Sequence, residues 1–434
     1  MNERRSADPP TSKAKDMNLK RRHCVLLSWS LLLAVPALAE VSGNSSFALR
    51  DGDRVVFYGD SITAQRLYTR FAEDMVVSRY PKLRIQFYNA GVSGDTVSGG
   101  HSGDMDTRLK RDVLPFHPTV VTIMLGMNDG RYTKEYEGNF KVYAEGYRKL
   151  IAGLREALPG VRLYLICPSP YDEIAHSPQV AGYNSVMIRY GQFVSELGKE
   201  QKIPVVDFNW PMTSAEERGV KVDRALAGSL QPDRIHPSPA GHWIMAAALV
   251  QGWNLDPTVS SVTIDAKQAR AGEEHNTFVR ELRVASDKIS WTQLDEALPL
   301  PLELNDPIAQ FLLQVSDLAQ LDRQMLRVTG LTAPTYTLFI DDKKIASFTG
   351  KELNDGVNLA LYQTPMEDQA KSIDWAADDR TRLSGTRFGL LTEEGIEQTA
   401  ALESLDELDL RMIDGEYKNA QPKPHAFELA LGEK

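Results

Sequence analysis

Alternation of strand-like and helix-like segments is the strongest constraint on the fold of the first half of this 434-residue chain. Five short apolar runs alternate with longer segments whose apolar residues recur at helical spacing. The strand-like runs are Arg54–Tyr58, Leu83–Tyr88, Val120–Leu125, Val161–Ile166 and Pro204–Phe208. The helix-like segments are Leu67–Arg79, Asn139–Ala157, Val180–Glu200 and Pro239–Trp253. This pattern predicts an α/β fold, in which helices cover both faces of a parallel sheet and reactive groups follow the carboxyl ends of its strands.

A serine follows the first strand-like run at a tight turn. The apolar run beginning at Val55 leads directly into Gly59, Asp60 and Ser61. A serine hydroxyl is a poor nucleophile unless a base removes its proton and a third group orients that base. Asp233 and His236 offer a carboxylate and an imidazole three residues apart. The sequence therefore contains the residue types that nucleophilic catalysis by serine requires.

Further hydrogen-bond donors follow two other strand-like runs. The loop Asn89–Asp95 contains Gly94, and the segment Gly126–Asp129 contains Asn128. Downstream, Pro237 favours an extended backbone at His236, and Ser238 is placed to cap a helix that begins at Pro239. We expect His236 to lie on a constrained loop immediately before that helix.

These four segments, in this order, resemble the blocks of the SGNH hydrolases, also called the GDSL esterase/lipase family, over about residues 51–255. The resemblance implies that Ser61 is the nucleophile, His236 the general base and Asp233 the carboxylate that orients the imidazole. It implies three oxyanion donors, the backbone N–H groups of Ser61 and Gly94 and the side-chain amide of Asn128. It also implies a three-layer α/β/α sandwich with a five-stranded, flavodoxin-like parallel sheet, and an acyl-enzyme mechanism with neither metal nor organic cofactor.

Two competing sites are weaker. Gly91–Gly94 nearly matches the Gly-x-Ser-x-Gly elbow of α/β-hydrolases, but Asp95 stands in place of the final glycine, so we interpret Ser93 as part of a loop. A metal site at His101, Asp104 and Asp106 lacks the spacing of a compact metal motif. A purely structural interpretation, in which Asp233 caps a turn and His236 lies at the surface, would be preferred if Ser61 were absent.

The N-terminal residues 1–39 have the pattern of a secretory signal peptide. Seven Lys or Arg against three acids precede an uncharged apolar run, and Ala37-Leu38-Ala39 predicts cleavage after Ala39. Met17 is an alternative start, and retention of the segment as a membrane anchor stays open. We therefore expect a secreted or periplasmic protein without stable membrane insertion once the signal is cleaved.

The net charge limits the possible binding partners, and the cysteine content limits the possible disulfides. The net charge of −10 becomes −14 without residues 1–39, which disfavours binding to nucleic acid or anionic membranes. Cys24 lies in the signal segment, so only Cys167 would remain and no internal disulfide can form. Its apolar setting predicts a buried structural thiol. The oligomeric state is left open.

The pattern changes from about Asp256, so we divide the mature chain into a hydrolase domain, residues 40–255, and a smaller mixed β/α accessory domain, residues 256–434. Its strand candidates are Val259–Ile264, Thr277–Val284, Gln324–Val328, Thr335–Phe339, Ile345–Thr349 and Phe427–Leu431, and its helical stretches are Pro307–Leu318, Pro365–Ala376 and Glu393–Ile413. Asp341-Asp342 predicts a hairpin turn. Helical spacing predicts a packing face formed by Leu402, Leu405, Leu408 and Met412.

The motifs identify the reaction as ester hydrolysis, but they do not identify the substrate. We favour removal of small acyl groups, most simply acetyl, from carbohydrate, because the loop from Gly94 to Arg108 is rich in hydrogen-bonding side chains such as Ser98, His101 and Asp104. A lysophospholipase, thioesterase or arylesterase of the same family is the alternative. A secreted glycan-binding protein without activity is the alternative from another class, for which Trp291, Tyr336, Trp375 and Phe388 would supply an aromatic platform if they do not belong to the core.

Overall fold

The computed structural model describes residues 46–134, 136–392 and 399–432. The predicted signal peptide lies outside the described residues. Ser46–Lys434 form one compact unit, and its N-terminal half contains a five-stranded parallel sheet. The strands of this sheet are β1 (Arg54–Gly59), β2 (Gln86–Gly91), β5 (Val120–Met124), β6 (Arg162–Cys167) and β7 (Val205–Asp207). The α/β prediction is confirmed.

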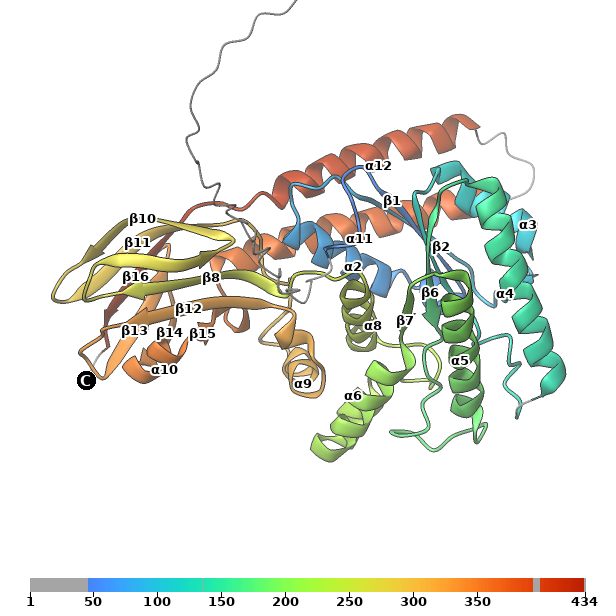
Figure 1. Cartoon of the computed structure of the whole chain (residues 1–434), viewed down its shortest axis with the longest axis horizontal. Coiled ribbons are helices and arrows are strands. Elements are labelled where there is room, and N and C mark those ends of the chain that lie inside the picture. The colour runs from blue at the N-terminus through green and yellow to red at the C-terminus, as the bar shows by residue number, and fades with distance from the viewer. Residues whose placement is uncertain (1–45, 135, 393–398, 433–434) are drawn as a thin grey trace, which may run out of the picture. The chain divides into compact units, whose positions relative to one another are not determined.

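The sheet has the spatial order β2-β1-β5-β6-β7, the flavodoxin-like arrangement. Helices α2 (Leu67–Arg79) and α8 (Pro239–Gly252) cover one face, and α4 (Glu137–Ala157) and α5 (Tyr183–Gln201) cover the other (Figure 1). Because both faces are covered, the central strands β1 and β5 are buried along almost their whole length. The chain leaves β1 for β2 on one side and reaches β5 on the other, so the carboxyl end of β1 lies at the point where the strand order reverses.

One strand of this sheet begins later than predicted. The run Leu83–Tyr88 was expected to be a strand, whereas β2 starts at Gln86 and continues to Gly91, in register with β1. The backbone of Ile85 is held instead by the hydroxyl of Tyr417, which accepts from its N–H at 2.9 Å and donates to its carbonyl at 3.0 Å. A long-range contact that local sequence does not show therefore sets this boundary.

The C-terminal half contains two further sheets, as the mixed β/α prediction requires. One has the order β10-β11-β16-β13-β14 with antiparallel pairing, and the other has the order β15-β12-β8-β9 with β12 and β8 parallel. Their strands are β8 (Thr258–Asp265), β9 (Arg270–His275), β10 (Thr277–Val284), β11 (Lys288–Asp295), β12 (Arg323–Thr329), β13 (Thr335–Ile340), β14 (Lys343–Thr349), β15 (Val357–Asn358) and β16 (His425–Leu431). The six predicted strands are all present, and β9, β11 and β15 were missed.

The predicted hairpin turn is confirmed. β13 and β14 pair antiparallel, and the two residues between them, Asp341 and Asp342, have φ values of 49° and 62°. Two consecutive left-handed residues are typical of the tight turn whose twist matches that of the flanking strands. The aromatic platform is not formed, because Trp291 and Tyr336 are buried in the core, while Trp375 is 65% exposed.

Two long helices follow the sheets, α11 (Pro365–Thr392) and α12 (Thr399–Asn419). α11 extends well beyond the predicted Pro365–Ala376, and the predicted start of the second helix at Glu393 lies outside the described residues. The predicted packing face is wrong at Leu408, which is 45% exposed. Asp409 takes the inward position instead and binds Arg380 on α11 at 2.9 Å. The face of α12 thus combines apolar contacts with ion pairs, a combination that a search for apolar spacing does not detect.

The remaining elements are short connections. They are α1 (Ser61–Ala64), β3 (Gly99–Gly100), β4 (Gly103–Asp104), α3 (Met105–Arg108), α6 (Asn209–Val222), α7 (Arg224–Gly228), α9 (Pro307–Val315) and α10 (Gly350–Asp355), with single turns at Leu109–Val113, Leu114–Phe116, Leu318–Gln320 and Leu359–Leu361. Within the described ranges, no helix combines the length and the apolar character needed to cross a bilayer.

The two halves of the chain are joined by buried ion pairs. Arg380 of α11 binds Glu73 of α2, and Arg79 of α2 pairs with Asp322 at 3.3 Å. Because these arginines and their partners are largely removed from water, breaking one pair would leave a buried charge without a counter-ion. The predicted division at residue 255 stays a prediction.

A buried carboxyl in α6 yields a prediction about pH and stability. Glu216 has no exposed surface, and its oxygens bond to no described residue. Burial, with Asp172 nearby, raises its pKa from 4.5 to about 9. A raised folded-state pKa means that its contribution to stability is complete below about pH 4.5 and is lost as the pH rises through about 9.

We therefore expect Glu216→Gln to increase the free energy of unfolding by about 2 kcal/mol or more at pH 9, and by little at pH 4, since each pKa unit corresponds to about 1.4 kcal/mol. Urea unfolding at the two pH values measures this difference. Glu217→Gln, at the exposed neighbouring position, is the matched control. An equal effect of both substitutions at pH 9 would show that Glu216 is not held neutral by burial.

Candidate active site

Ser61 lies at the centre of the carboxyl edge of the sheet. β1 ends at Gly59, and Ser61 is the first residue of the short helix α1. Asp60 caps this helix, its side chain accepting the N–H of Ile62 at 3.0 Å. Gly59 has no room for a side chain, because an added Cβ would lie 2.8 Å from the Met124 carbonyl oxygen. The Gly-Asp-Ser sequence thus forms a close turn that holds the serine at the strand end.

The structure brings the three predicted catalytic side chains into one hydrogen-bonded chain. His236 Nε2 lies 2.8 Å from Ser61 Oγ, and His236 Nδ1 lies 2.7 Å from Asp233 Oδ2. In neutral histidine one ring nitrogen donates and the other accepts. With Nδ1–H donating to Asp233, Nε2 accepts the serine hydroxyl proton, which is the arrangement a general base requires.

Asp233 is prepared to remain ionised. Its Oδ1 accepts the backbone N–H of Ile235 at 2.9 Å and that of His236 at 2.7 Å. Partial burial raises its pKa, but hydrogen bonds from the backbone and ring of His236 and from Ile235 outweigh burial and lower it overall. A carboxylate with a lowered pKa stabilises the imidazolium that forms when His236 takes a proton.

The loop carrying Asp233 and His236 is held by residues that the sequence did not single out. Gln231 donates its amide to the Pro170 carbonyl at 3.0 Å, and Asp172 donates its N–H to the Arg234 carbonyl at 2.9 Å. Arg234 itself has a left-handed φ of 74°. α8 begins at Pro239 as predicted, although Ser238, at its N-cap position, makes no side-chain capping bond.

The three predicted oxyanion donors follow neighbouring strands. Ser61, Gly94 and Asn128 come after β1, β2 and β5, which pair so that Gly59 lies opposite both Gly91 and Met124. Gly94 has a φ of 74°, which a glycine adopts without strain. Asn128 is oriented by two bonds, its Nδ2 donating to the Asp95 carbonyl at 3.0 Å and its Oδ1 accepting the Tyr132 hydroxyl at 3.1 Å. One N–H of the amide is left for a ligand.

A buried ion-pair network supports these strand ends. Arg108 is fully buried, binds Asp95 Oδ2 at 3.0 Å and Asp112, and donates to the Ala90 carbonyl at 2.8 Å. Asp95 in turn accepts the Asn128 amide through its backbone. This corrects the expectation for the end of the Gly94–Arg108 loop, because the Arg108 side chain is bound inside the protein. An arginine in a polar loop gives no sequence signal of burial, because its partners come from separate elements.

The rest of the polar loop is only partly available to a ligand. Asp104 caps α3 by accepting the Thr107 N–H at 2.9 Å, and it lies with Ser98 and Asp106 in a surface pocket against α4. His101 is exposed and close to Gly94, one of the predicted oxyanion donors, since a Cβ built on Gly94 would lie 3.5 Å from its ring. Among Ser98, His101 and Asp104, His101 is therefore the side chain that the contacts place next to Gly94.

The rival sites receive no support. Ser93 is an exposed loop residue, and no group of three or more potential metal ligands occurs among the described residues. Cys167 is a free, buried thiol as predicted, and burial raises its pKa to about 11. His242 is buried, accepts the Tyr68 N–H at 3.1 Å and lies 3.0 Å from Gln65 Oε1. Burial lowers its pKa to about 3, so it is neutral and links α1, α2 and α8.

Comparisons with known proteins agree with the fold and with ester hydrolysis as the type of reaction. Residues 57–244 match the GDSL-like lipase/acylhydrolase family. An acetylxylan esterase from Geobacillus stearothermophilus is 28% identical over 219 residues, which cover 46% of this chain and 93% of that protein. The solved structure of a gut microbial diltiazem-metabolizing enzyme matches with a TM-score of 0.77 at 24% identity, covering 88% of this chain and 98% of that chain. That likeness concerns the fold and extends into the C-terminal half.

The α/β sandwich and the serine, histidine and carboxylate at its carboxyl edge define a carboxylic ester hydrolase. Residues 57–244 thus carry the match to the GDSL-like lipase/acylhydrolase family, and over this part of the chain the resemblance to SGNH hydrolases is confirmed.

Proposed function

We propose that Ser61, His236 and Asp233 form the catalytic triad of a serine esterase that removes small acyl groups, most simply acetyl, from carbohydrate. The observation that carries the chemistry is the continuous hydrogen-bonded chain from Asp233 through His236 to Ser61, with distances of 2.7 and 2.8 Å. A glycan-binding protein without activity would not need a serine hydroxyl in contact with an oriented imidazole.

The reaction follows from this geometry. Ser61 Oγ attacks the ester carbonyl carbon while His236 Nε2 takes its proton, and the carbonyl oxygen becomes an oxyanion bound by Ser61, Gly94 and Asn128. The tetrahedral intermediate expels the alcohol, which receives the proton from His236, and leaves an acyl-enzyme. Water then attacks the acyl group with His236 again as base, and the carboxylic acid and free Ser61 result.

The acetyl and carbohydrate parts of the proposal rest on two supports. The first is the similarity to the acetylxylan esterase, which extends over nearly the whole of that protein. The second is exposed His101 beside Gly94, since an imidazole next to a predicted oxyanion donor can hydrogen-bond a sugar hydroxyl and has no such partner in an acyl chain.

Acetate release decides between the carbohydrate and lipid alternatives. We expect the protein to release acetate from acetylated xylan, and to hydrolyse aryl acetates faster than aryl esters of longer acids. The measurement compares acetate yield from the polysaccharide with kcat/KM across aryl esters of increasing chain length. Activity that rises with chain length, without acetate release from glycan, would favour a lysophospholipase or thioesterase, and activity confined to aryl esters would favour an arylesterase.

We also propose that the protein is exported and cleaved after Ala39, on the strength of the basic and apolar pattern of residues 1–39. Mass spectrometry of the exported protein should find Glu40 at its N-terminus. Recovery with residues 24–39 still attached would instead indicate a membrane-anchored form.

A further inference from the structure

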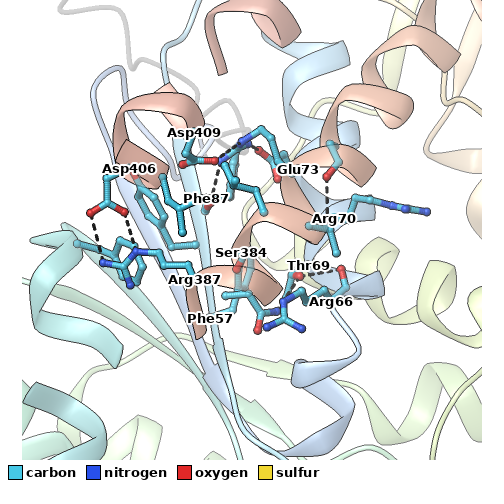
Figure 2. A pocket seen from close by; sticks show the side chains of 18 residues that line it. Phe57, Arg66, Thr69, Arg70, Glu73, Phe87, Ser384, Arg387, Asp406 and Asp409 are labelled. Carbon is cyan, nitrogen blue, oxygen red and sulfur yellow. Dashed lines mark hydrogen bonds and ion pairs between the residues drawn. The ribbon is translucent and has the colours of Figure 1, made fainter. Parts of the chain in front are cut away.

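A cavity lies where α11 and α12 pack against α2, β1 and β2 (Figure 2). Its empty space is about 580 Å³, part of it open to solvent. Ser61, Asp233 and His236 are not among the residues that line it. The catalytic reaction proposed above therefore gives this cavity no role.

Four arginines line the cavity, and three of them are neutralised by carboxylates. These pairs join Arg70 to Asp374 and Asp378, Arg380 to Glu73, Asp409 and Glu416, and Arg387 to Asp406. Arg66 has no carboxylate partner among the residues that the structure describes. In Figure 2 it lies on the α2 side of the cavity, apart from the Arg387–Asp406 pair.

One edge of the Arg66 guanidinium is unused. Nη1 donates to the Ala64 carbonyl at 3.0 Å, whereas Nε is buried without a hydrogen-bond partner, and Nη2 bonds to none of the described residues. Nε and Nη2 form the edge of a guanidinium that binds both oxygens of a carboxylate. Leaving a buried donor unpaired is unfavourable, so this edge is suited to an anionic ligand.

The other residues that line the cavity indicate the chemical character of the rest of the ligand. The Ser384 hydroxyl, from α11, makes no hydrogen bond within the described part of the chain. The rings of Phe57, Phe87 and Phe116 supply apolar surface. Among the described lining residues, Arg66 is the arginine without a carboxylate partner, so one negative charge can pair with it. The second charge of a phosphate would instead add to the negative charge of the six carboxylates that hold the other three arginines.

We propose that this cavity binds a small monocarboxylate with a short apolar or aromatic body. The carboxylate lies on Nε and Nη2 of Arg66 within reach of Ser384, and the apolar body lies against the phenylalanine rings. The proposal does not depend on the esterase activity.

The backbone at Arg66 offers a variant that preserves the fold. Arg66 is the N-cap residue of α2, with φ 63° and ψ 4°, and its side chain makes no capping bond. Asparagine tolerates this left-handed conformation and is a preferred N-cap residue. Arg66→Asn therefore removes the guanidinium with little expected loss of stability, which thermal unfolding can verify.

The test is calorimetric titration of the purified protein with sodium benzoate at constant ionic strength. We expect a Kd on the order of 1 mM, as befits a ligand of this size. Arg66→Asn should weaken binding at least about tenfold. Ser384→Leu, which fills the cavity with Arg66 intact, should also weaken it. Arg382→Gln removes an exposed arginine of α11 and should bind benzoate like the wild type.

Two further titrations complete the test. Ser61→Ala should bind benzoate as the wild type does, which separates this site from the proposed catalytic one. Inorganic phosphate should bind more weakly than benzoate. Unchanged benzoate affinity in Arg66→Asn, absence of binding to the folded wild type, or tighter binding of phosphate would overturn the proposal.

Discussion

Ser61→Ala should reduce ester hydrolysis by about 10⁴–10⁶-fold, since removing the nucleophile of a serine hydrolase leaves only the contribution of substrate binding and the oxyanion donors. The variant should fold normally, because the Ser61 side chain is hydrogen-bonded only to His236 among the described residues. Turnover of an aryl acetate and covalent labelling by a fluorophosphonate measure the effect.

Ser93→Ala is the matched control, because Ser93 is an exposed serine in the neighbouring loop. It should retain full labelling and nearly full activity. If the reagent instead labels Ser93 in the Ser61→Ala protein, the assignment of the nucleophile is wrong. His236→Ala should be almost as severe as Ser61→Ala, because the serine and its base act as one unit.

Asn128→Ala should lower kcat by about 10²–10³-fold with little change in KM, because an oxyanion donor binds the transition state more strongly than the ground-state carbonyl. The amide is well placed for this role, since one bond to Asp95 and one from Tyr132 fix its orientation. Steady-state kinetics on an aryl acetate give both constants.

Tyr132→Phe provides the comparison. It removes the hydroxyl that donates to Asn128 Oδ1 but leaves the amide in place, so we expect less than about a tenfold loss of kcat. A change confined to KM in Asn128→Ala would identify Asn128 as a substrate contact. Lower thermal stability with ordinary activity would assign it a structural role only.

Local sequence predicted the main strands and helices of the N-terminal half well. The alternation of apolar runs with helix-like segments predicted the parallel sheet, and α2 has the predicted bounds. The candidates for the triad could also be identified from the sequence, because Ser61, Asp233 and His236 lie in short motifs of recognisable residue types. The hairpin turn at Asp341-Asp342 was also predicted correctly, because the preference of these residues for a left-handed backbone is a local property.

Tertiary structure alone decided which polar groups are buried and what they bind. β2 starts later than predicted because the Tyr417 hydroxyl bonds to the backbone of Ile85. On α12, Asp409 and not Leu408 lies on the packed face, because Asp409 binds Arg380. These outcomes depend on partners tens or hundreds of residues away in the sequence. The local spacing of apolar residues does not indicate such partners.

The arginines show this division most clearly. Arg108 and Arg66 both lie close to the motifs in the sequence, yet one is fully buried among carboxylates and carbonyls and the other lacks any carboxylate partner in the described structure. The amino-acid sequence by itself determined the alternation of strands and helices that forms the parallel sheet, and the residue types available around Ser61. Only the packing of distant elements decided whether a given charge has a carboxylate partner, because the energy of a charge depends on its three-dimensional surroundings.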